Sequence, residues 1–266
     1  MARNNSFVKL EGTLDGLTFY KSNGENLVKT KSSVSKNRIM NDPAYRRTRE
    51  NMQEFGGAAR IGKALREAFA GVVKLMADTF MGGRINGIMK RVNSNGAGAR
   101  GEREFDLITN SILFQSFEFN LKTPFDAQFF APSSPISIDP GRNILSWSIP
   151  DFDTDTFIRK PESATHCKLV LAAGYVSNYA FLPATKSYEP VDDAVNGKGD
   201  VVYSTDIPLK GMVGAVTNLD IDMSALGAIP ATTLLFATTG IIFYQEINGN
   251  LYELAQGNAM KIASTG

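Results

Sequence analysis

The spacing of apolar side chains changes twice along this chain of 266 residues, and the changes divide it into parts with different predicted structures. Residues 6–31 show the alternation of β-strands, and from Ala44 the apolar side chains recur every three or four residues, as in a helix. Residues 105–266 contain apolar runs of strand length separated by Gly, Pro, Asn and Asp. The sequence therefore predicts an α+β fold: an N-terminal β-hairpin or meander, a long basic helix plus a second helix, then an all-β, sandwich-like C-terminal domain.

The predicted N-terminal hairpin turns at Asn23-Gly24. Because Asn-Gly favours a type I′ turn, the turn fixes the register and pairs Phe19 with Val28 and Tyr20 with Leu27. A third strand is predicted before this hairpin, with the apolar residues Phe7, Val8 and Leu10. So small a sheet buries little by itself and needs a cover, which either the rest of the chain or a neighbouring subunit supplies.

Residues 32–43 are predicted to be a polar connector that ends in an Asn41/Asp42 cap, with Pro43 at the first helical position. The helix that follows carries one stripe of apolar or small side chains: Met52, Phe55, Ala59, Gly62, Leu65, Phe69, Val72, Met76 and Phe80. Its opposite face is mostly charged: Arg46, Arg49, Gln53, Arg60, Lys63, Glu67 and Lys74. Gly82-Gly83 is predicted to end this helix before a second helical segment over 84–92.

The Gly-rich stretch NSNGAGARGER is predicted to be a flexible linker between the helices and the β-rich part. We therefore expect four parts: an N-terminal β-meander with its connector over 1–43, a helical segment over 44–93, the linker over 94–104, and a sandwich-like domain over 105–266. Among its aromatic residues, Trp147, Phe152 and Phe181 are predicted to anchor the core of that domain.

Charge is distributed unevenly along the chain. Residues 1–104 hold 19 Lys+Arg against 10 Asp+Glu, whereas residues 105–266 hold 9 against 17. Such a split favours either a basic arm that binds nucleic acid or two complementary surfaces that bring like molecules together head to tail. A solvated basic helix that happens to precede an acidic domain is the third alternative.

No catalytic arrangement is evident in the sequence. His166 and Cys167 are the only histidine and cysteine, and adjacent residues of a strand point to opposite faces, so they cannot form a nucleophile–base pair. Gly96, Gly98 and Gly101 match a Gly-x-Gly-x-x-Gly pattern but lack the preceding strand and following helix of a dinucleotide site. We therefore predict that the protein is not an enzyme, has no cofactor and has no small-molecule substrate, although paired carboxylates stay an open alternative.

Three aspartates at alternate positions, Asp151, Asp153 and Asp155, precede Glu162 with the acidic spacing of a calcium loop. Thr156 stands where such a loop needs glycine for its sharp turn. Whether these carboxylates bind a cation is left open, and a solvated acidic loop is the favoured interpretation.

The chain has no apolar stretch long enough to span a bilayer, and its first residues lack the apolar segment of a secretory signal. We expect a protein that is made in the cytoplasm, with no signal peptide or transmembrane segment. Its final location is left open.

Several motifs are specific enough to support a resemblance: KLEGTLDGLTFYKSNGENLVKTKSSVS, RIMNDPAYRRTRENMQEFG and the late GIIFYQEINGNLYEL. In these motifs the chain resembles a group of uncharacterised proteins of Bacteroidota. The likeness covers the first 70 residues best. It implies the same architecture of N-terminal hairpin, helices and β-rich domain, and it implies no assigned activity.

These observations lead to one functional hypothesis and one alternative. The first is a non-enzymatic structural protein that self-assembles into a homo-oligomer or polymer, as a filament, sheet, shell or virion-like component. Its candidate assembly interface comprises Phe19, Tyr20, Leu27, Arg46, Arg47, Arg49 and Arg60. The alternative is a protein that binds nucleic-acid phosphates through the basic helix over 44–92, although interleaved acidic residues such as Glu50 favour a protein partner.

Overall fold

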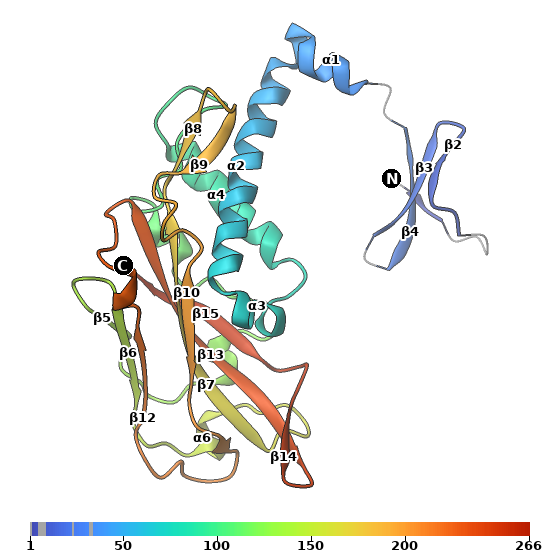
Figure 1. The fold of residues 1–266 in the computed structure, drawn as a ribbon. Coiled ribbons are helices and arrows are strands. Elements are labelled where there is room, and N and C mark those ends of the chain that lie inside the picture. The colour runs from blue at the N-terminus through green and yellow to red at the C-terminus, as the bar shows by residue number, and fades with distance from the viewer. Residues whose placement is uncertain (1, 5–8, 23, 32–33) are drawn as a thin grey trace. The chain divides into compact units, whose positions relative to one another are not determined.

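The computed structural model describes residues 2–4, 9–22, 24–31 and 34–266 (Figure 1). The chain divides into two compact units, Met1–Glu50 and Asn51–Gly266. The division falls inside helix α2 (Arg46–Ala68). The fold is α+β, with N-terminal strands, a long helix and a C-terminal, sandwich-like part, as the sequence predicted.

Among the described residues of the first unit, four short strands form an antiparallel sheet in the order β1-β4-β3-β2. The strands are β1 (Ala2–Arg3), β2 (Gly12–Leu14), β3 (Leu17–Ser22) and β4 (Glu25–Thr30). The predicted register is confirmed, because Phe19 pairs with Val28 and Tyr20 pairs with Leu27. Phe7, Val8 and Asn23 lie outside the described residues, and Leu10 lies outside any strand.

Between strands β2 and β3 the chain turns at Asp15 and Gly16, which have positive φ angles of 44° and 79°. Two consecutive positive φ angles are what a type I′ turn requires. Part of the predicted connector is helical: α1 (Lys36–Asn41) begins where the Ser35 side chain accepts a hydrogen bond from the Arg38 N–H. Asp42 then caps the 3-10 helix η1 (Pro43–Tyr45) by accepting from the Ala44 N–H.

Three helices follow: α2, α3 (Ala70–Met76) and α4 (Met81–Asn95). The single stripe predicted over about 35 residues is thus interrupted at Phe69, whose φ of −109° and ψ of 23° leave the helical region. Helix α4 begins at Met81, so Gly82-Gly83 lies in its first turn rather than between two helices. Its buried face starts at Met81, and tertiary packing therefore decides this boundary against the low helix propensity of glycine.

The second unit, which is described throughout, contains a large antiparallel sheet. Four of its strands follow the order β10-β7-β13-β14. In addition, β11 pairs with β7, and β15 pairs with β13. The bounds are β7 (His166–Ser177), β10 (Gly199–Tyr203), β11 (Ile207–Pro208), β13 (Thr233–Ile247), β14 (Asn250–Glu253) and β15 (Ala259–Thr265). Strands β7 and β13 are the centre of this sheet.

A second, three-stranded sheet has the order β12-β6-β5, from β5 (Ser137–Ile138), β6 (Ile144–Ile149) and β12 (Thr217–Asp222). A separate hairpin pairs β8 (Tyr179–Leu182) with β9 (Ser187–Pro190). The remaining elements are single turns of helix: η2 (Ser111–Phe114), α5 (Phe125–Gln128), α6 (Thr154–Phe157) and η3 (Ser224–Leu226).

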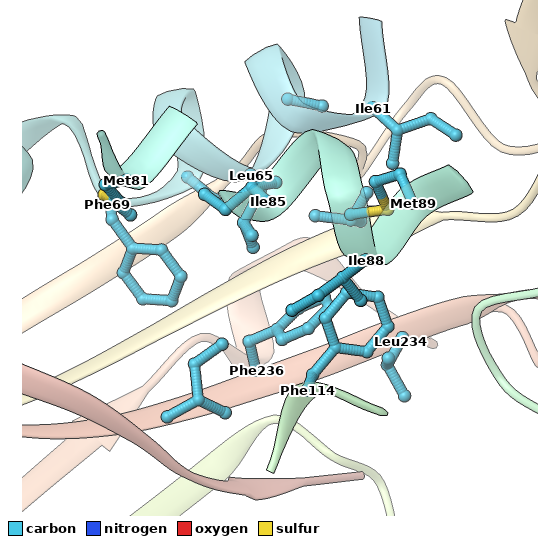
Figure 2. Packing of buried hydrophobic residues seen from close by; sticks show 14 of the residues in the cluster. Ile61, Leu65, Phe69, Met81, Ile85, Ile88, Met89, Phe114, Leu234 and Phe236 are labelled. Carbon is cyan, nitrogen blue, oxygen red and sulfur yellow. The ribbon is translucent and has the colours of Figure 1, made fainter. Parts of the chain in front are cut away.

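Alternate side chains of β7 belong to two different cores, which gives the second unit three layers. On one face of the large sheet, Leu169, Leu171 and further buried residues pack with Trp147 and Leu219 of the three-stranded sheet. Val170 and others pack with residues of α2, α3 and α4, as Figure 2 shows around Ile61, Leu65, Ile85, Met89 and Phe236. The large sheet therefore lies between a helical layer and a second sheet.

Glycine at position 174 permits the close approach of helix α2 to the large sheet. A Cβ at Gly174 would lie 2.7 Å from the Cβ of Ala68 and 3.2 Å from the Phe69 ring. Since atoms of side chains do not pack at 2.7 Å, any larger residue would push the helix away from strand β7.

Candidate functional site

The N-terminal sheet has two chemically different faces, because side chains opposite one another across an antiparallel pair share a face. The pairs Phe19–Val28 and Leu14–Leu17 place four apolar side chains on one face. We call this group, Leu14, Leu17, Phe19 and Val28, the apolar face.

The opposite face of the sheet is polar around two apolar side chains. Tyr20 and Leu27 pair with each other there, and the Lys29 ammonium lies 5.4 Å from the centre of the Tyr20 ring. Arg3 forms an ion pair of 3.0 Å with Glu25 on the same face. The structure thus separates the predicted interface residues: Phe19 lies on one face, and Tyr20 and Leu27 lie on the other.

None of the described residues among 2–49 is buried. On the apolar face, Leu14 is 63% exposed and Leu17 is 42% exposed. A folded sheet usually buries one of its faces against another layer. The first unit therefore presents a sheet whose apolar face has no buried side chain.

The predicted arginines have different partners. Arg46 Nε donates to Glu50 over 3.0 Å, and Arg47 Nη1 donates to the other oxygen of the same carboxylate over 2.8 Å. Arg49 Nη1 donates to the backbone carbonyls of Ile39 and Asp42, over 2.7 and 2.9 Å. Arg49 thereby ties the start of α2 to α1, so its guanidinium has a structural role within the first unit.

Arg60 lies in the second unit and joins helix α2 to the β8–β9 hairpin. Its Nη1 donates to the Tyr188 carbonyl over 2.8 Å and to Glu189 Oε1 over 2.6 Å. The same carboxylate accepts from Ser187, and these two hydrogen bonds lower the pKa of Glu189. Arg60 therefore belongs to a surface ion pair within the second unit.

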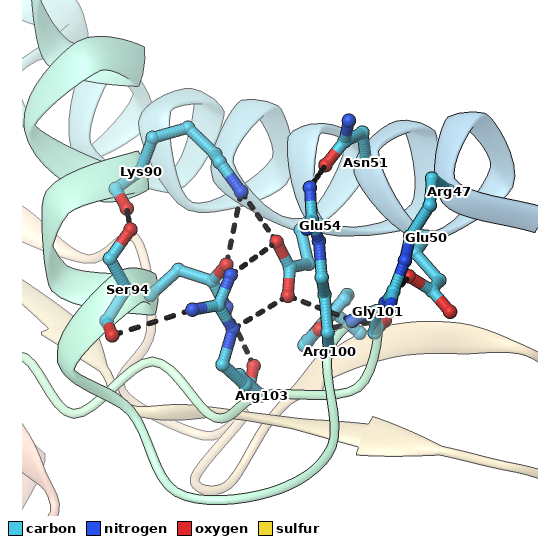
Figure 3. A network of polar contacts seen from close by, with 11 residues as sticks. Arg47, Glu50, Asn51, Glu54, Lys90, Ser94, Arg100, Gly101 and Arg103 are labelled. Atoms are coloured by element: carbon cyan, nitrogen blue, oxygen red, sulfur yellow. Dashed lines mark hydrogen bonds and ion pairs between the residues drawn. The ribbon is translucent and has the colours of Figure 1, made fainter.

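The most enclosed polar cluster was not predicted from the sequence. Glu54 of α2 is fully buried, and its carboxylate accepts four hydrogen bonds (Figure 3). Lys90 Nζ donates over 2.7 Å, Arg103 donates from Nε and Nη2 over 2.8 and 2.9 Å, and the Gly101 N–H donates over 2.8 Å. Burial by itself would raise the pKa of Glu54, but these hydrogen bonds lower it to about 2.

The partners of Glu54 come from α4 and from the Gly-rich segment predicted to be a linker. Asn93 Nδ2 donates to the Arg103 carbonyl over 2.7 Å, and the Tyr188 hydroxyl donates to the Gly101 carbonyl over 3.1 Å. The cluster thus attaches this segment to α2 and the β8–β9 hairpin. The Glu54 carboxylate thus accepts from donors within the chain on both of its oxygens, and the cluster holds these segments together.

The acidic triplet has partners of its own. Asp153 caps α6 and also accepts from the Thr156 hydroxyl over 2.8 Å. Asp155 accepts from the Gly211 N–H over 2.9 Å, and Asp151 accepts from the Gly214 N–H over 2.8 Å. Within the described part of the chain, no group of three or more His, Cys, Asp and Glu side chains is arranged to hold a metal ion.

The remaining sequence motifs have ordinary surroundings. Cys167 is fully buried between the two sheets, and its burial raises the pKa of the thiol to about 12. Gly98 and Gly101 have φ angles of 107° and 98° in a loop that follows helix α4. In the ranges that the structure describes, no helix has the length and apolar character needed to cross a membrane.

Comparisons of the chain with protein-family models, curated proteins and solved structures found no match.

Proposed function

We propose that this chain is a non-enzymatic structural protein that assembles with copies of itself into a homo-oligomer or polymer. The observation that carries the proposal is the apolar face of the N-terminal sheet, on which Leu14 and Leu17 are largely exposed. Removing such side chains from water contributes roughly 25 cal/mol for each Å² of apolar surface that is buried. A subunit contact over this face would supply the layer that the sheet lacks.

Charge favours the second unit of another copy as the occupant of that face. Residues 1–50 hold 10 Lys+Arg against 5 Asp+Glu, whereas residues 51–266 hold 18 against 22. The two units thus carry net charges of +5 and −4, so a contact between unlike units is electrostatically attractive and one between two N-terminal units is not. Contacts between unlike surfaces repeat from copy to copy and produce rings or open polymers.

The nucleic-acid alternative has weaker support. Arg46 and Arg47 already share the Glu50 carboxylate, and Arg49 donates to two carbonyls. A helix that binds phosphates needs cations with few competing partners, because each phosphate contact replaces an existing interaction. These three residues therefore offer less to a phosphate backbone than their number suggests.

Sedimentation velocity of the full-length protein over a range of concentrations tests the proposal. We expect regular oligomers for the wild type and a shift to monomer for the double variant Leu14→Ser with Leu17→Ser, which removes two side chains from the apolar face. The matched control is Tyr20→Ser with Leu27→Ser, which removes two side chains from the opposite face. The control should still assemble.

A wild type that stays monomeric at every concentration and salt would sink the proposal, and so would equal loss of assembly in both variants. Adding a duplex oligonucleotide to the same runs separates the alternative from the proposal. Co-sedimentation of protein and duplex at physiological salt, without oligomers of the protein alone, would favour nucleic-acid binding.

A further inference from the structure

A cavity of about 810 Å³ lies in the second unit, between three segments of the chain and Leu75 of helix α3. One wall is formed by residues 120–128 around helix α5, a second by residues 159–161 after α6, and a third by the loop 255–258 between β14 and β15. Its volume is in the range of pockets that bind small molecules.

The three walls are attached to one another, so the cavity does not depend on a ligand for its shape. Thr123 Oγ1 donates to the Asn258 carbonyl over 2.9 Å, which joins the first wall to the third. The Arg159 N–H donates to the Gln128 carbonyl over 2.8 Å, which joins the second wall to the first. Gly257, with a φ of +89°, packs so closely on Pro161 that a Cβ there would lie 2.8 Å from its ring.

Cationic side chains line this cavity and carboxylates do not. Lys122, Arg159 and Lys160 are in the lining, which contains no Asp or Glu. This is unexpected in residues 105–266, where acidic residues outnumber basic ones by 17 to 9. The charged side chains of the lining are therefore all cationic, although this part of the chain is acidic overall.

Of the three cations in the lining, Lys160 has interaction partners and the other two have none among the described residues. Lys160 Nζ donates to the Leu209 carbonyl over 2.8 Å and lies 3.3 Å from Asp155. Within the described residues, the side chains of Lys122 and Arg159 have no hydrogen-bond or ion-pair partner. An arginine with a free guanidinium and a lysine in the same lining suit an oxyanion, because the guanidinium can donate two parallel hydrogen bonds to it.

Two other cavities of the second unit have carboxylates as well as cations in their lining. The cavity beside α3 contains Lys74 and Lys168 but also Glu253, and Lys168 pairs with Asp206 over 3.2 Å. The cavity beside β15 contains Lys261, whose ammonium is bound by the Asp126 carboxylate. In both, a carboxylate lines the cavity together with the cations.

We propose that the cavity lined by Lys122 and Arg159 binds a small, hydroxyl-rich oxyanion, such as a phosphorylated, sulfated or carboxylated sugar. The cations would hold the anionic group, and the amide side chains of Asn120, Gln128 and Gln256 would donate to and accept from hydroxyl groups. No aromatic ring lines the cavity, so it offers no stacking surface for a nucleobase. This site is independent of the proposed assembly face.

Titration of the full-length protein, followed by two-dimensional NMR of its side-chain amides and by calorimetry, tests the site. The probes are inorganic phosphate, glucose 6-phosphate, glucose 6-sulfate, glucuronate and uncharged glucose. We expect saturable binding of at least one sugar oxyanion, tighter than inorganic phosphate, with shifts at the amides of Gln128 and Gln256. Glucose should not bind.

The double variant Lys122→Gln with Arg159→Gln should weaken that binding at least tenfold, because it removes both uncommitted cations. The control is Lys198→Gln, an exposed lysine that does not line the cavity, and it should bind as the wild type does. An unchanged melting temperature in both variants would show that folding is intact. The proposal is overturned if no oxyanion binds the wild type, or if the double variant binds as tightly as the control.

Discussion

The Met1–Glu50 and Asn51–Gly266 units are both built on antiparallel sheets, but their sheets are covered differently. The large sheet of the second unit has a helical layer on one face and a three-stranded sheet on the other, and both interfaces are fully buried. The described residues 2–49 contain no buried side chain. Since buried apolar surface is the main source of folding free energy, stability is concentrated in the second unit.

The largest expected effect comes from the core between the helices and the large sheet. Phe236 of β13 is fully buried, with its ring 5.1 Å from that of Phe114 in an edge-to-face contact. Replacing Phe236 by Ala should lower the free energy of unfolding by about 3–5 kcal/mol, because it removes buried surface and leaves a cavity. Denaturant unfolding followed by the fluorescence of Trp147, the only tryptophan, measures this.

The control for that substitution is Phe55→Ala on helix α2, where the ring is 56% exposed. We expect a change within about 0.5 kcal/mol, as for other surface positions. If both substitutions lowered the free energy of unfolding by the same amount, the contrast between covered and uncovered apolar side chains would be wrong.

A smaller loss of stability is expected from replacing Glu54, because its partners Lys90 and Arg103 keep some contact with water. The pKa of this carboxyl is about 2 in the folded protein, against an ordinary value of 4.5, so its contribution to stability is fully present above pH 4.5. The contribution is lost as the pH falls towards 2, when the carboxylate is protonated in the folded state as well. The Glu54→Gln variant should be less stable at pH 7 by about 2–3 kcal/mol and should lack this acid-dependent loss.

Denaturant unfolding at pH 7, 4 and 2.5 measures the pH dependence of that difference. Glu67→Gln is the matched control, because Glu67 pairs with Lys63 over 3.3 Å on the exposed side of the same helix. Its stability should follow that of the wild type at each pH. A Glu54→Gln variant with the wild-type pH profile would contradict the assigned role of the buried cluster.

The smallest effect is expected in the N-terminal sheet of the monomer. Leu17→Ala removes a side chain that is 42% exposed, so the Trp147-monitored unfolding transition should stay within about 0.5 kcal/mol of the wild type. The measurement is made at a concentration where sedimentation shows monomer. A clear loss of stability there would mean that the second unit depends on this sheet.

Local patterns in the sequence were enough to predict much of the first unit and the fold class. The register of Phe19 with Val28 follows from turn chemistry that lies within a few residues. The apolar period of α2 was less informative: Leu65 of the predicted stripe is buried, but Met52 and Phe55 of the same stripe are 54% and 56% exposed. A period defines a face of a helix, and only tertiary packing decides how much of its length is covered.

The candidate sites could be predicted only in part, for a related reason. Glu54 meets Lys90 and Arg103, which are 36 and 49 residues later in the chain, and nothing local in the sequence pairs them. The same holds for the oxyanion cavity, where Lys122 and Arg159 come from different walls. Individual charges were visible in the sequence, but their convergence depends on the arrangement of the layers.

The position of Cys167 gives the second unit a chemical reporter of its own opening. The thiol is the only one in the chain and is enclosed between the two sheets, with its pKa raised to about 12 by burial. A thiol reagent can reach it only after the sheets separate, so the labelling rate counts those separations under native conditions.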